Sequence, residues 1–552
     1  MRRLAERGIH GRVNISPSSS TSAWWRRGTK AGRAAWLACC ALATGLSLPA
    51  MAQQGPRFPV LEIRVLGNTV LSPIAVEEAV LPHLGVGRTA ADVEKAREAL
   101  EEAYSRAGYP TVSVELPQQR VNAGIITLRV VERPVGRLRV VNAEWYSPRA
   151  VRDGAPSLAE GRVPHMPAVQ RDIVALNRQA DRRVIPELVP GSEPGTVDVN
   201  LRVEDRIPLH ANVELNNRQV RNTSDLRTSA TVRYENLWQR GDSVSAGFQT
   251  APQRTSDAMV LLGSYLWRVP GSAVSVLTSF THSDSSLASF GGSVIGRGTT
   301  LGLRGIVPLG GGGNGFSHTF VAGIDRKAYR EGLPGQTLGA DRTEIPITYY
   351  PISAAYQASW IGEQADTELG FTGTFGVRGL GSSDAVFERK RADASSSFIV
   401  LRADMTRTQR LPNDWQLWGR ASGQFTRDPL VANEQFALGG LDSVRGYYEV
   451  AALADGGAAV QTELRTPSVA GQLGKPVNEM RLLGFVDGGY AALNRSLPQQ
   501  TRSYTLGSAG LGARAKLYDH LNAAVDGAAV MTDGPGSRAG SVRLLFRLWG
   551  DF

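Results

Sequence analysis

The residues best suited to chemistry are one arginine and one aspartate in two separate segments. Arg445 lies in the glycine-rich run Phe436-Ala-Leu-Gly-Gly-Leu-Asp-Ser-Val-Arg-Gly-Tyr447, and Asp487 lies in Phe485-Val-Asp-Gly-Gly489. An arginine confined away from water needs an anionic partner, because an unpaired buried charge is costly. If the two segments meet, Asp487 is a plausible partner, and the chemistry is a confined ion pair.

The residues around this pair allow a close approach of two backbones. Glycine has no side chain to keep a neighbouring chain at a distance, and Tyr447 could stack on neighbouring groups. A second Val-Arg-Gly tripeptide at 377–379 shows that the tripeptide alone proves little. We interpret Arg378 as a strand residue facing water, and Arg445 taken alone would be a solvated loop arginine. The candidate residues are Gly439, Gly440, Val444, Arg445, Gly446 and Tyr447 in the first segment, and Phe485, Asp487, Gly488 and Gly489 in the second.

A strand around Asp487 would decide where its carboxylate points. Alternate residues of a strand face opposite sides, so Phe485 and Asp487 share one face and Val486 takes the other. If Val486 faces lipid, Asp487 faces a lumen.

From about residue 208 the chain alternates in this way and loses helical periodicity. The last strand puts Val542, Leu544, Phe546 and Leu548 on one face, with Arg543 and Arg547 on the other. A soluble sandwich would not usually point two arginines into its core. A transmembrane barrel has apolar residues toward lipid and polar residues toward its lumen, so this pattern favours a barrel.

The length agrees with a barrel. Residues 208–552 are 345 positions, which fit about 16 antiparallel strands at roughly 9–11 residues per strand plus turns. Phe552 ends the chain on the apolar register of the last strand. Candidates for the aromatic girdles are Trp238, Trp267, Trp360, Trp415, Trp418 and Trp549.

An internal repeat precedes the barrel. Ser72-Pro73, a helix N-cap followed by proline at the first helical position, recurs as Ser147-Pro148. Both copies read as strand, helix, helix, strand, strand; the longer helix runs from Thr89 to Gly108 in the first copy and over 168–177 in the second. Two copies of one small domain fit this better than one large domain. We expect a mainly β protein with two small α+β domains at 58–134 and 135–207, followed by the barrel at 208–552.

The N-terminal segment has the features of an export signal. Residues 1–33 hold eight Arg or Lys and Glu6, so they carry +7 of the formal net charge of +10. An apolar run over 34–48 leads to Pro49-Ala-Met-Ala52, a small-residue cleavage pattern. Residues 1–52 are therefore expected to be a signal peptide with an extended basic part. The rest of the chain carries a net charge of only +3 and has no basic stripe that would indicate binding of nucleic acid.

Several function classes are disfavoured. Cys39 and Cys40, the two cysteines, fall in the apolar run, so the mature chain would have no disulfide or cysteine metal site. The run Gly310–Gly315 lacks the Lys-Ser/Thr of a phosphate loop. The seven histidines lack zinc-site spacing, and there is no Gly-x-Ser-x-Gly elbow. No run of 18 apolar residues follows Ala52, which excludes a helical membrane protein. We expect no enzyme activity, cofactor, metal or nucleotide partner.

Taken together, the mature chain resembles the two-partner secretion transporters of the TpsB family, haemolysin/filamentous haemagglutinin-type secretion and activation proteins. These belong to the superfamily that joins POTRA domains to a β-barrel. The two repeat copies resemble POTRA domains, and Gly124–Glu132 resembles the closing POTRA strand. Asn236–Asp242 resembles the turn after the second barrel strand, and Phe375–Gly381 resembles a strand of haemolysin-type members. The run 436–447 resembles the tip of a loop that folds back into the barrel, here around 436–455.

The resemblance implies roles for the candidate residues. In such transporters a loop-tip arginine pairs with an aspartate on the inner barrel wall, which carries over to Arg445 and Asp487. A terminal aromatic residue resembles the signal read by the barrel-assembly machinery, which carries over to Phe552. The implied location is the outer membrane of a Gram-negative bacterium, with the POTRA domains in the periplasm.

The implied function is export of a large secreted partner protein from periplasm to cell surface. The partner would be a TpsA-type adhesin, haemolysin or contact-dependent toxin, and biogenesis would involve the barrel-assembly machinery, periplasmic chaperones and outer-membrane lipid. One alternative is a barrel-assembly factor of the same superfamily, against which two POTRA copies argue. Another is a passive porin, which needs no periplasmic repeats. Some relatives carry an N-terminal plug helix. Gln53–Arg57 is too short for one, so the folded-in loop is expected to close the resting pore.

Overall fold

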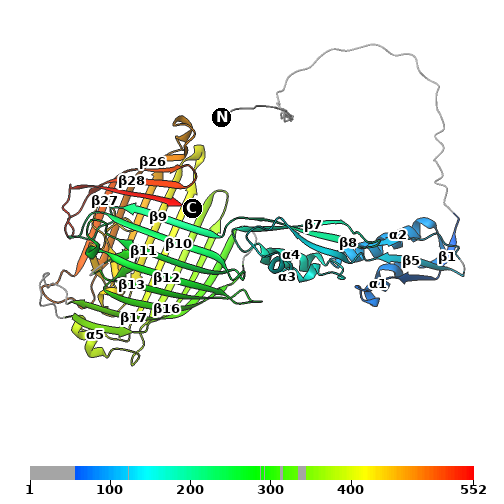
Figure 1. Cartoon of the computed structure of the whole chain (residues 1–552), viewed down its shortest axis with the longest axis horizontal. Coiled ribbons are helices and arrows are strands. Elements are labelled where there is room, and N and C mark those ends of the chain that lie inside the picture. Colours follow the sequence, from blue (N-terminus) through cyan, green and yellow to red (C-terminus); the bar gives the residue numbers. More distant parts are fainter. Residues whose placement is uncertain (1–55, 122, 286–287, 291–292, 311–314, 333–343) are drawn as a thin grey trace, which may run out of the picture.

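The structure, a computed structural model, describes residues 56–552 except 122, 286–287, 291–292, 311–314 and 333–343. It consists of a β-barrel with an elongated arm attached to one end (Figure 1). The expected signal peptide at 1–52, residues 53–55 of the segment used to argue against a plug helix, and residues 311–314 of the glycine-rich run lie outside the described residues.

The outer part of the arm is a small α+β unit. The Ser72 hydroxyl accepts a hydrogen bond from the Ala75 N–H (3.2 Å) and caps the first helix. The Asp92 carboxylate accepts from the Thr89 N–H (2.9 Å) and caps the second. Its elements are β1 (Phe58–Val60), β2 (Glu62–Leu66), α1 (Pro73–Val80), the 3₁₀ turn Leu81–His83, β3 (Gly85–Arg88), α2 (Ala90–Arg106), β4 (Ser113–Glu115) and β5 (Ile125–Val131).

This unit contains one feature that the sequence pattern did not predict. The expected strand over 60–66 is divided, because β1 pairs with the short strand β3 while β2 pairs in parallel with β5. Strand β4 completes the sheet in the order β2-β5-β4. Leu100, Tyr104 and Leu128 are fully buried between the helices and this sheet.

The inner part of the arm repeats the plan. Its elements are β6 (Val135–Val141), α3 (Pro148–Asp153), the 3₁₀ turn Pro156–Leu158, α4 (Met166–Leu176), β7 (Arg182–Pro190) and β8 (Val197–Asp205). The sheet order is β6-β8-β7, with β6 and β8 parallel. Ser147 again caps a helix that starts with proline, so the repeated Ser-Pro signal has the same structural meaning in both copies.

The barrel closes by antiparallel pairing of its first and last strands. Strands β18 and β19 both pair with β17 and together fill one position, which gives 16 positions and confirms the expected number. The strands are β9 (Leu209–Asn216), β10 (Arg227–Leu237), β11 (Asp242–Thr250), β12 (Met259–Arg268), β13 (Ser275–Ser283), β16 (Gly298–Pro308), β17 (Phe316–Gly332), β18 (Glu344–Tyr349), β19 (Ile352–Ile361), β20 (Ala365–Phe375), β21 (Ile399–Arg410), β22 (Gln416–Phe425), β25 (Gly456–Arg465), β26 (Val477–Ala492), β27 (Ser503–Leu517), β28 (Leu521–Val530) and β29 (Val542–Asp551).

Alternation gives each barrel strand an apolar outer face and a polar inner face. On β25, Val460 and Leu464 are exposed whereas Gln461 and Glu463 are buried. The outward residues are those that a lipid environment would cover. Among the described residues, no helix has both the length and the apolarity needed to cross a bilayer.

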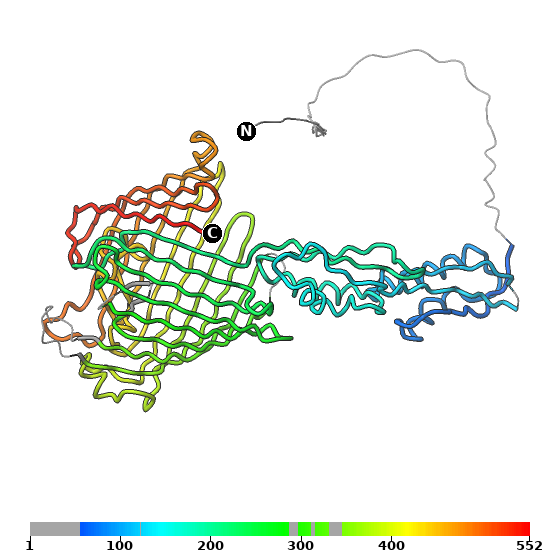
Figure 2. Tube along the Cα trace, viewed as in Figure 1, coloured from blue at the N-terminus to red at the C-terminus, as the bar shows by residue number. Residues whose placement is uncertain are grey.

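The barrel and the arm are joined through the turn between β10 and β11. Figure 2 shows the trace passing from the arm directly into the first barrel strand. Gln239 in that turn accepts a hydrogen bond from the Ser147 N–H (2.9 Å) and donates to the Trp145 carbonyl (3.1 Å). The Asp181 carboxylate also lies 2.7 Å from Nε2 of His210 on β9. These contacts fix the arm to one end of the barrel.

Candidate functional site

The candidate site is the segment between β22 and β25, whose tip packs against the inner wall of the barrel. Within it, β23 (Phe436–Leu438) pairs with β24 (Ala452–Ala454), and the tip between them spans 439–451. We call residues 426–455 the inner loop. Leu438, Val444 and Tyr447 of this loop are buried against inward-facing residues of β26, β27 and β28. A glycine-rich tip held by a two-stranded stem therefore occupies part of the lumen.

Arg445 is the most deeply held charged group of the tip, with 1% of its surface exposed. Its Nε and Nη2 donate to the two oxygens of Asp487 at 2.7 Å each, and its own backbone N–H donates to Oδ2 at 3.1 Å. The guanidinium also lies over the Phe485 ring, 3.7 Å from the centroid. Paired hydrogen bonds and a ring face fix the plane of the guanidinium as well as its charge.

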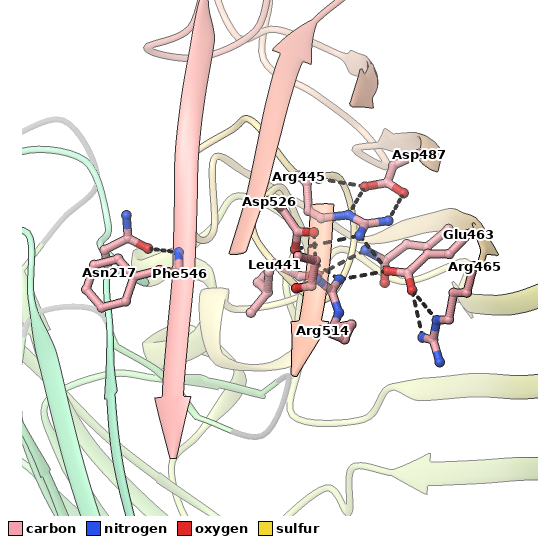
Figure 3. Close-up of polar contacts among 11 residues, drawn as sticks. Asn217, Leu441, Arg445, Glu463, Arg465, Asp487, Arg514, Asp526 and Phe546 are labelled. Atoms are coloured by element: carbon pink, nitrogen blue, oxygen red, sulfur yellow. Dashed lines mark hydrogen bonds and ion pairs between the residues drawn. The ribbon is translucent and has the colours of Figure 1, made fainter. Parts of the chain in front are cut away.

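Two further carboxylates complete the surroundings of Arg445 (Figure 3). Nη1 donates to Glu463 on β25 at 2.6 Å and lies 3.8 Å from Asp526 on β28. Arg514 on β27 bridges the same two carboxylates, at 2.9 Å from Glu463 and 2.7 Å from Asp526. Arg465 donates to the other oxygen of Glu463 at 2.8 Å. Three arginines thus balance three carboxylates, and removal of Arg445 would leave the buried Asp487 without its ionic partner.

All but one of the glycines of the site sit where a side chain would press on a neighbour. A Cβ on Gly489 would lie 2.5 Å from Leu438 Cδ1 and 3.2 Å from Val444 Cγ2, whereas a Cβ on Gly488 would meet no atom within 4 Å. Gly446 adopts φ +91°, which disfavours other residues, and faces Ala528 and Val530. Gly488 and Gly489 are neighbours in sequence, but only Gly489 faces the inner loop.

Other residues of the tip form hydrogen bonds to further segments of the barrel. The Tyr447 hydroxyl donates to the Thr532 carbonyl at 2.6 Å and lies 3.0 Å from the Gly507 carbonyl. Glu449 accepts from the Leu441 N–H at 3.0 Å and from Arg218 Nε at 3.1 Å. Arg218 follows β9 and also pairs with Asp442, so the tip is attached to the first strand as well as to the last ones.

The stem of the inner loop has its own buried ionic anchors. Glu434, 1% exposed, pairs with Lys327 on β17, accepts from the Tyr349 hydroxyl at 2.8 Å and lies 3.6 Å from Arg402. Asp455, fully buried, accepts from Arg391 at 2.8 Å and from the backbone N–H of Asn494 at 2.7 Å. The loop is therefore held at both its tip and its stem.

The structure brings the two segments singled out in the sequence together. Gly439, Gly440, Val444, Arg445, Gly446 and Tyr447 lie in the tip, and Phe485, Asp487, Gly488 and Gly489 lie on β26. Val486 is 60% exposed and Asp487 2% exposed, so they occupy opposite faces. Phe552 is not part of the site: its backbone pairs with Ala211 at the end of β29, and its ring is exposed.

The interpretations of three residues were wrong. Arg378 was expected on a strand, but β20 ends at Phe375 and Arg378 is an exposed turn residue paired with Asp384 at 3.3 Å. Trp418 and Trp549 were expected in the girdles, but both line a lumenal cavity. In both strands the alternation points these indoles inward, beside Arg465 and Arg547.

Sequence reasoning missed Glu463, Asp526 and Arg514. The signal for each was a charged residue at a strand position whose direct neighbours in sequence are uncharged. Alternation indicates that such residues face the lumen. It does not show which of them lie at the same height along the barrel axis as Asp487. That depends on the register between strands, which pairs Asp487 with Gln461 and Ser508.

Comparisons with known proteins agree with this architecture. The family model described as haemolysin secretion/activation protein ShlB/FhaC/HecB matches residues 195–515, and the model for a POTRA domain, ShlB-type, matches residues 58–133. The outer membrane transporter CdiB of Dickeya dadantii is 25% identical over 452 residues, covering 80% of this chain and 77% of the relative. The heme/hemopexin transporter protein HuxB of Haemophilus influenzae is 21% identical, covering 75% and 73%.

Solved structures show the same fold. CdiB from Escherichia coli superposes with a TM-score of 0.59 at 19% identity, covering 92% of this chain and 93% of that one. BamA from Haemophilus ducreyi, lacking its first three POTRA domains, gives 0.53 at 14% identity, with coverages of 90% and 100%.

Proposed function

This chain belongs to the haemolysin secretion/activation protein family ShlB/FhaC/HecB, and from that premise we propose that it exports a large partner protein through its barrel. Members of this family are outer-membrane transporters of two-partner secretion systems, and the chain is one of them. The observation that supports the route through the barrel is the inner loop. Its tip occupies the lumen but is held there by hydrogen bonds and ion pairs, which can be broken and re-formed.

The arm provides the recognition step in this proposal. Residues 58–134 and 135–207 are two POTRA domains in the periplasm. Strand β7 is nine residues long and pairs with β8 only, among the strands that the structure describes. Leu188 and Val189 on it are exposed. An extended segment of the partner adds to this edge, because an unpaired strand edge offers a row of backbone hydrogen bonds.

Passage then requires the inner loop to move. Breaking the Arg445 network costs about 3–5 kcal/mol for a buried pair left without its partner, and binding of the arriving partner offsets it. Folding of the partner outside the cell drives export, since the chain shows no nucleotide-binding motif. The partner is a TpsA-type adhesin, haemolysin or contact-dependent toxin. During biogenesis, the barrel-assembly machinery reads Phe552 after periplasmic chaperones deliver the chain.

The two alternative functions, a passive porin and a barrel-assembly factor, explain fewer of these features. A passive porin needs neither a two-unit arm nor a lumenal loop with buried ionic anchors. A barrel-assembly factor would share the fold of BamA, but the family match is to the secretion and activation proteins.

The proposal is tested by comparing Arg445→Ala with Arg378→Ala, the second arginine in a Val-Arg-Gly tripeptide. We expect the first variant to lose most export of the cognate partner, measured outside the cell at matched barrel abundance. The second, whose side chain is 72% exposed, should export normally. Unchanged export by Arg445→Ala at normal abundance would refute the role of the inner loop.

A further inference from the structure

A cavity of about 190 Å³ lies in the lumen next to the tip of the inner loop. Arg445, Glu463, Asp526 and Arg514 form part of its lining together with Phe546 of β29, and Figure 3 shows Leu441 of the tip beside the ionic group. The cavity is too small for a folded domain and large enough for a side chain or two. Trp418, Trp549 and Arg547 also line it and take no part in the ion pairs that hold the tip.

The cavity faces the end of the barrel that carries the arm. Arg465 is the last residue of β25, Trp418 is near the start of β22, and Trp549 is near the end of β29. These strand ends lie at the same end as the start of β9, which follows the arm directly. In Figure 1 the C-terminus lies at that end too. A chain entering from the arm would meet this cavity before it met the closed tip.

The solvent-accessible charge of the cavity is positive. Its lining includes five arginines and three carboxylates. Glu463 and Asp526 are only 3% and 2% exposed, and both are already paired with Arg445 and Arg514. The side chains of Arg420, Arg465, Arg514 and Arg547 are 21–38% exposed, so solvent reaches them. The only comparably open carboxylate in the lining is Asp442, at 34%.

Two indoles stand next to these cations. The Arg465 guanidinium lies 5.2 Å from the centre of a Trp418 ring, and that of Arg547 lies 4.3 Å from Trp549. Arg420 has the least committed guanidinium of the group: among the described residues its ionic partner is Asp442, at 3.5 Å. Arg547 also donates to Glu214 at 2.7 Å. A guanidinium has five N–H donors, and those left over beside flat apolar walls suit carboxylate side chains carried on an extended chain.

We propose that this cavity is a docking site for acidic side chains of an extended segment of the exported partner. The inference rests on the proposed function and adds the chemistry of the segment. The site would hold Asp or Glu side chains of the exported partner on the side of the tip that faces the arm. They would lie next to the carboxylates that Arg445 and Arg514 neutralise. A bound acidic segment would compete for those arginines and so loosen the tip.

The test measures binding to the purified full chain in detergent or nanodiscs. The probe is a fluorescent twelve-residue peptide of alternating Glu and Ser, compared with a Lys and Ser peptide of the same length. We expect the acidic peptide to bind at least about tenfold more tightly, with affinity that falls as salt rises. Equal binding of the two peptides would overturn the proposal without any variant.

Matched variants locate the site. Arg420→Gln should weaken binding of the acidic peptide by about fivefold or more, and Arg420→Lys should restore it because the charge is retained. The control is Arg304→Gln, since Arg304 faces the lumen from β16, outside this cavity, and pairs with Asp325 at 2.7 Å. Its affinity should match the wild type. If Arg304→Gln weakens binding as much as Arg420→Gln, or Arg420→Gln has no effect, the assignment is wrong. If peptide binding fails while the partner is still exported, only this inference falls and the proposed function stands.

Discussion

The Arg445 guanidinium donates one hydrogen bond to each carboxylate oxygen of Asp487, and the Arg445 backbone N–H donates a third to the same carboxylate. The side chain therefore fixes the position of the loop backbone as well as neutralising a charge. This relation joins the tip of the inner loop to the centre of one wall strand. The ring of Phe485 beneath the guanidinium and Glu463 beside it leave little freedom for another geometry.

Arg445→Lys should therefore not substitute for the wild type. Lysine keeps the charge, but its ammonium cannot present the planar fork that reaches Asp487 with two bonds and Glu463 with a third. We expect export between that of the wild type and that of Arg445→Ala, at matched barrel abundance. Export equal to the wild type would mean that charge alone matters and that the geometry of the pair does not.

Exchanging Arg445 and Asp487 should also fail to restore export. In Arg445→Asp combined with Asp487→Arg, the new aspartate would face Glu463 and Asp526, which already lie around this position. Repulsion between buried carboxylates would outweigh the restored pair. Secretion of the partner by the double variant should stay as low as that of Arg445→Ala. Full restoration would show that the two residues act as an isolated pair.

Gly488 and Gly489 offer a matched pair of substitutions. A methyl group at Gly489 would press on Leu438 and Val444 of the tip, whereas one at Gly488 meets nothing within 4 Å. Gly489→Ala should displace the tip at a cost of about 1–3 kcal/mol and raise the conductance of the purified protein in planar bilayers. Gly488→Ala serves as the control and should conduct like the wild type. Equal conductance of all three proteins would contradict the idea that the tip closes the pore.

Glu434→Gln should loosen the stem of the inner loop. The substitution leaves Lys327, which is 17% exposed, without its carboxylate partner, and the loss is about 3–5 kcal/mol for a buried pair. Hydrogen exchange should rise over 426–438 relative to the wild type. Glu388→Gln on the exposed face of α5 (Asp384–Lys390) is the control, and it should leave exchange in the stem unchanged. No rise in the stem would show that the tip alone holds the loop.

The first arm unit should lose helix stability in acid because of Asp92. The hydrogen bond from the Thr89 backbone N–H lowers the pKa of the Asp92 carboxyl below its ordinary value. Because the folded-state pKa is depressed, the stabilisation is present above the unfolded pKa, about 4, and disappears as pH falls through the lower folded value. Asp92→Asn should speed exchange at the start of α2 at pH 7, after correction for intrinsic rates. The difference from the wild type should shrink toward pH 3, and a difference that persists there would exclude the charged cap as its cause.

The sequence predicted the parts of the site that depend on local pattern. Alternation predicted that Asp487 and Val486 face opposite ways, and the Ser-Pro caps predicted the helix starts at 73 and 148. Contacts set by strand register or by the path of the loop could not be obtained in this way. Glu463, Asp526 and Arg218 reach the tip from β25, β28 and the segment after β9, and nothing local marks them as neighbours. Trp418 was misplaced because a tryptophan in a barrel strand suits a girdle as well as a lumenal wall.

The most direct test of the account is to lock the tip to the wall with Val444→Cys and Gly489→Cys. Val444 Cγ2, where the new sulfur would sit, lies 3.2 Å from a Cβ built on Gly489, close to the separation of about 3 Å that a disulfide requires. The measurement is export of the partner with the disulfide formed and after reduction, with thiol labelling to report the bond. The single-cysteine variants are the controls, and Gly489→Cys alone gives the effect of the added Cβ at this position, which presses on Leu438. We predict that export stops while the bond is intact and returns on reduction. Full export through a barrel whose tip is shown to be locked would contradict the account.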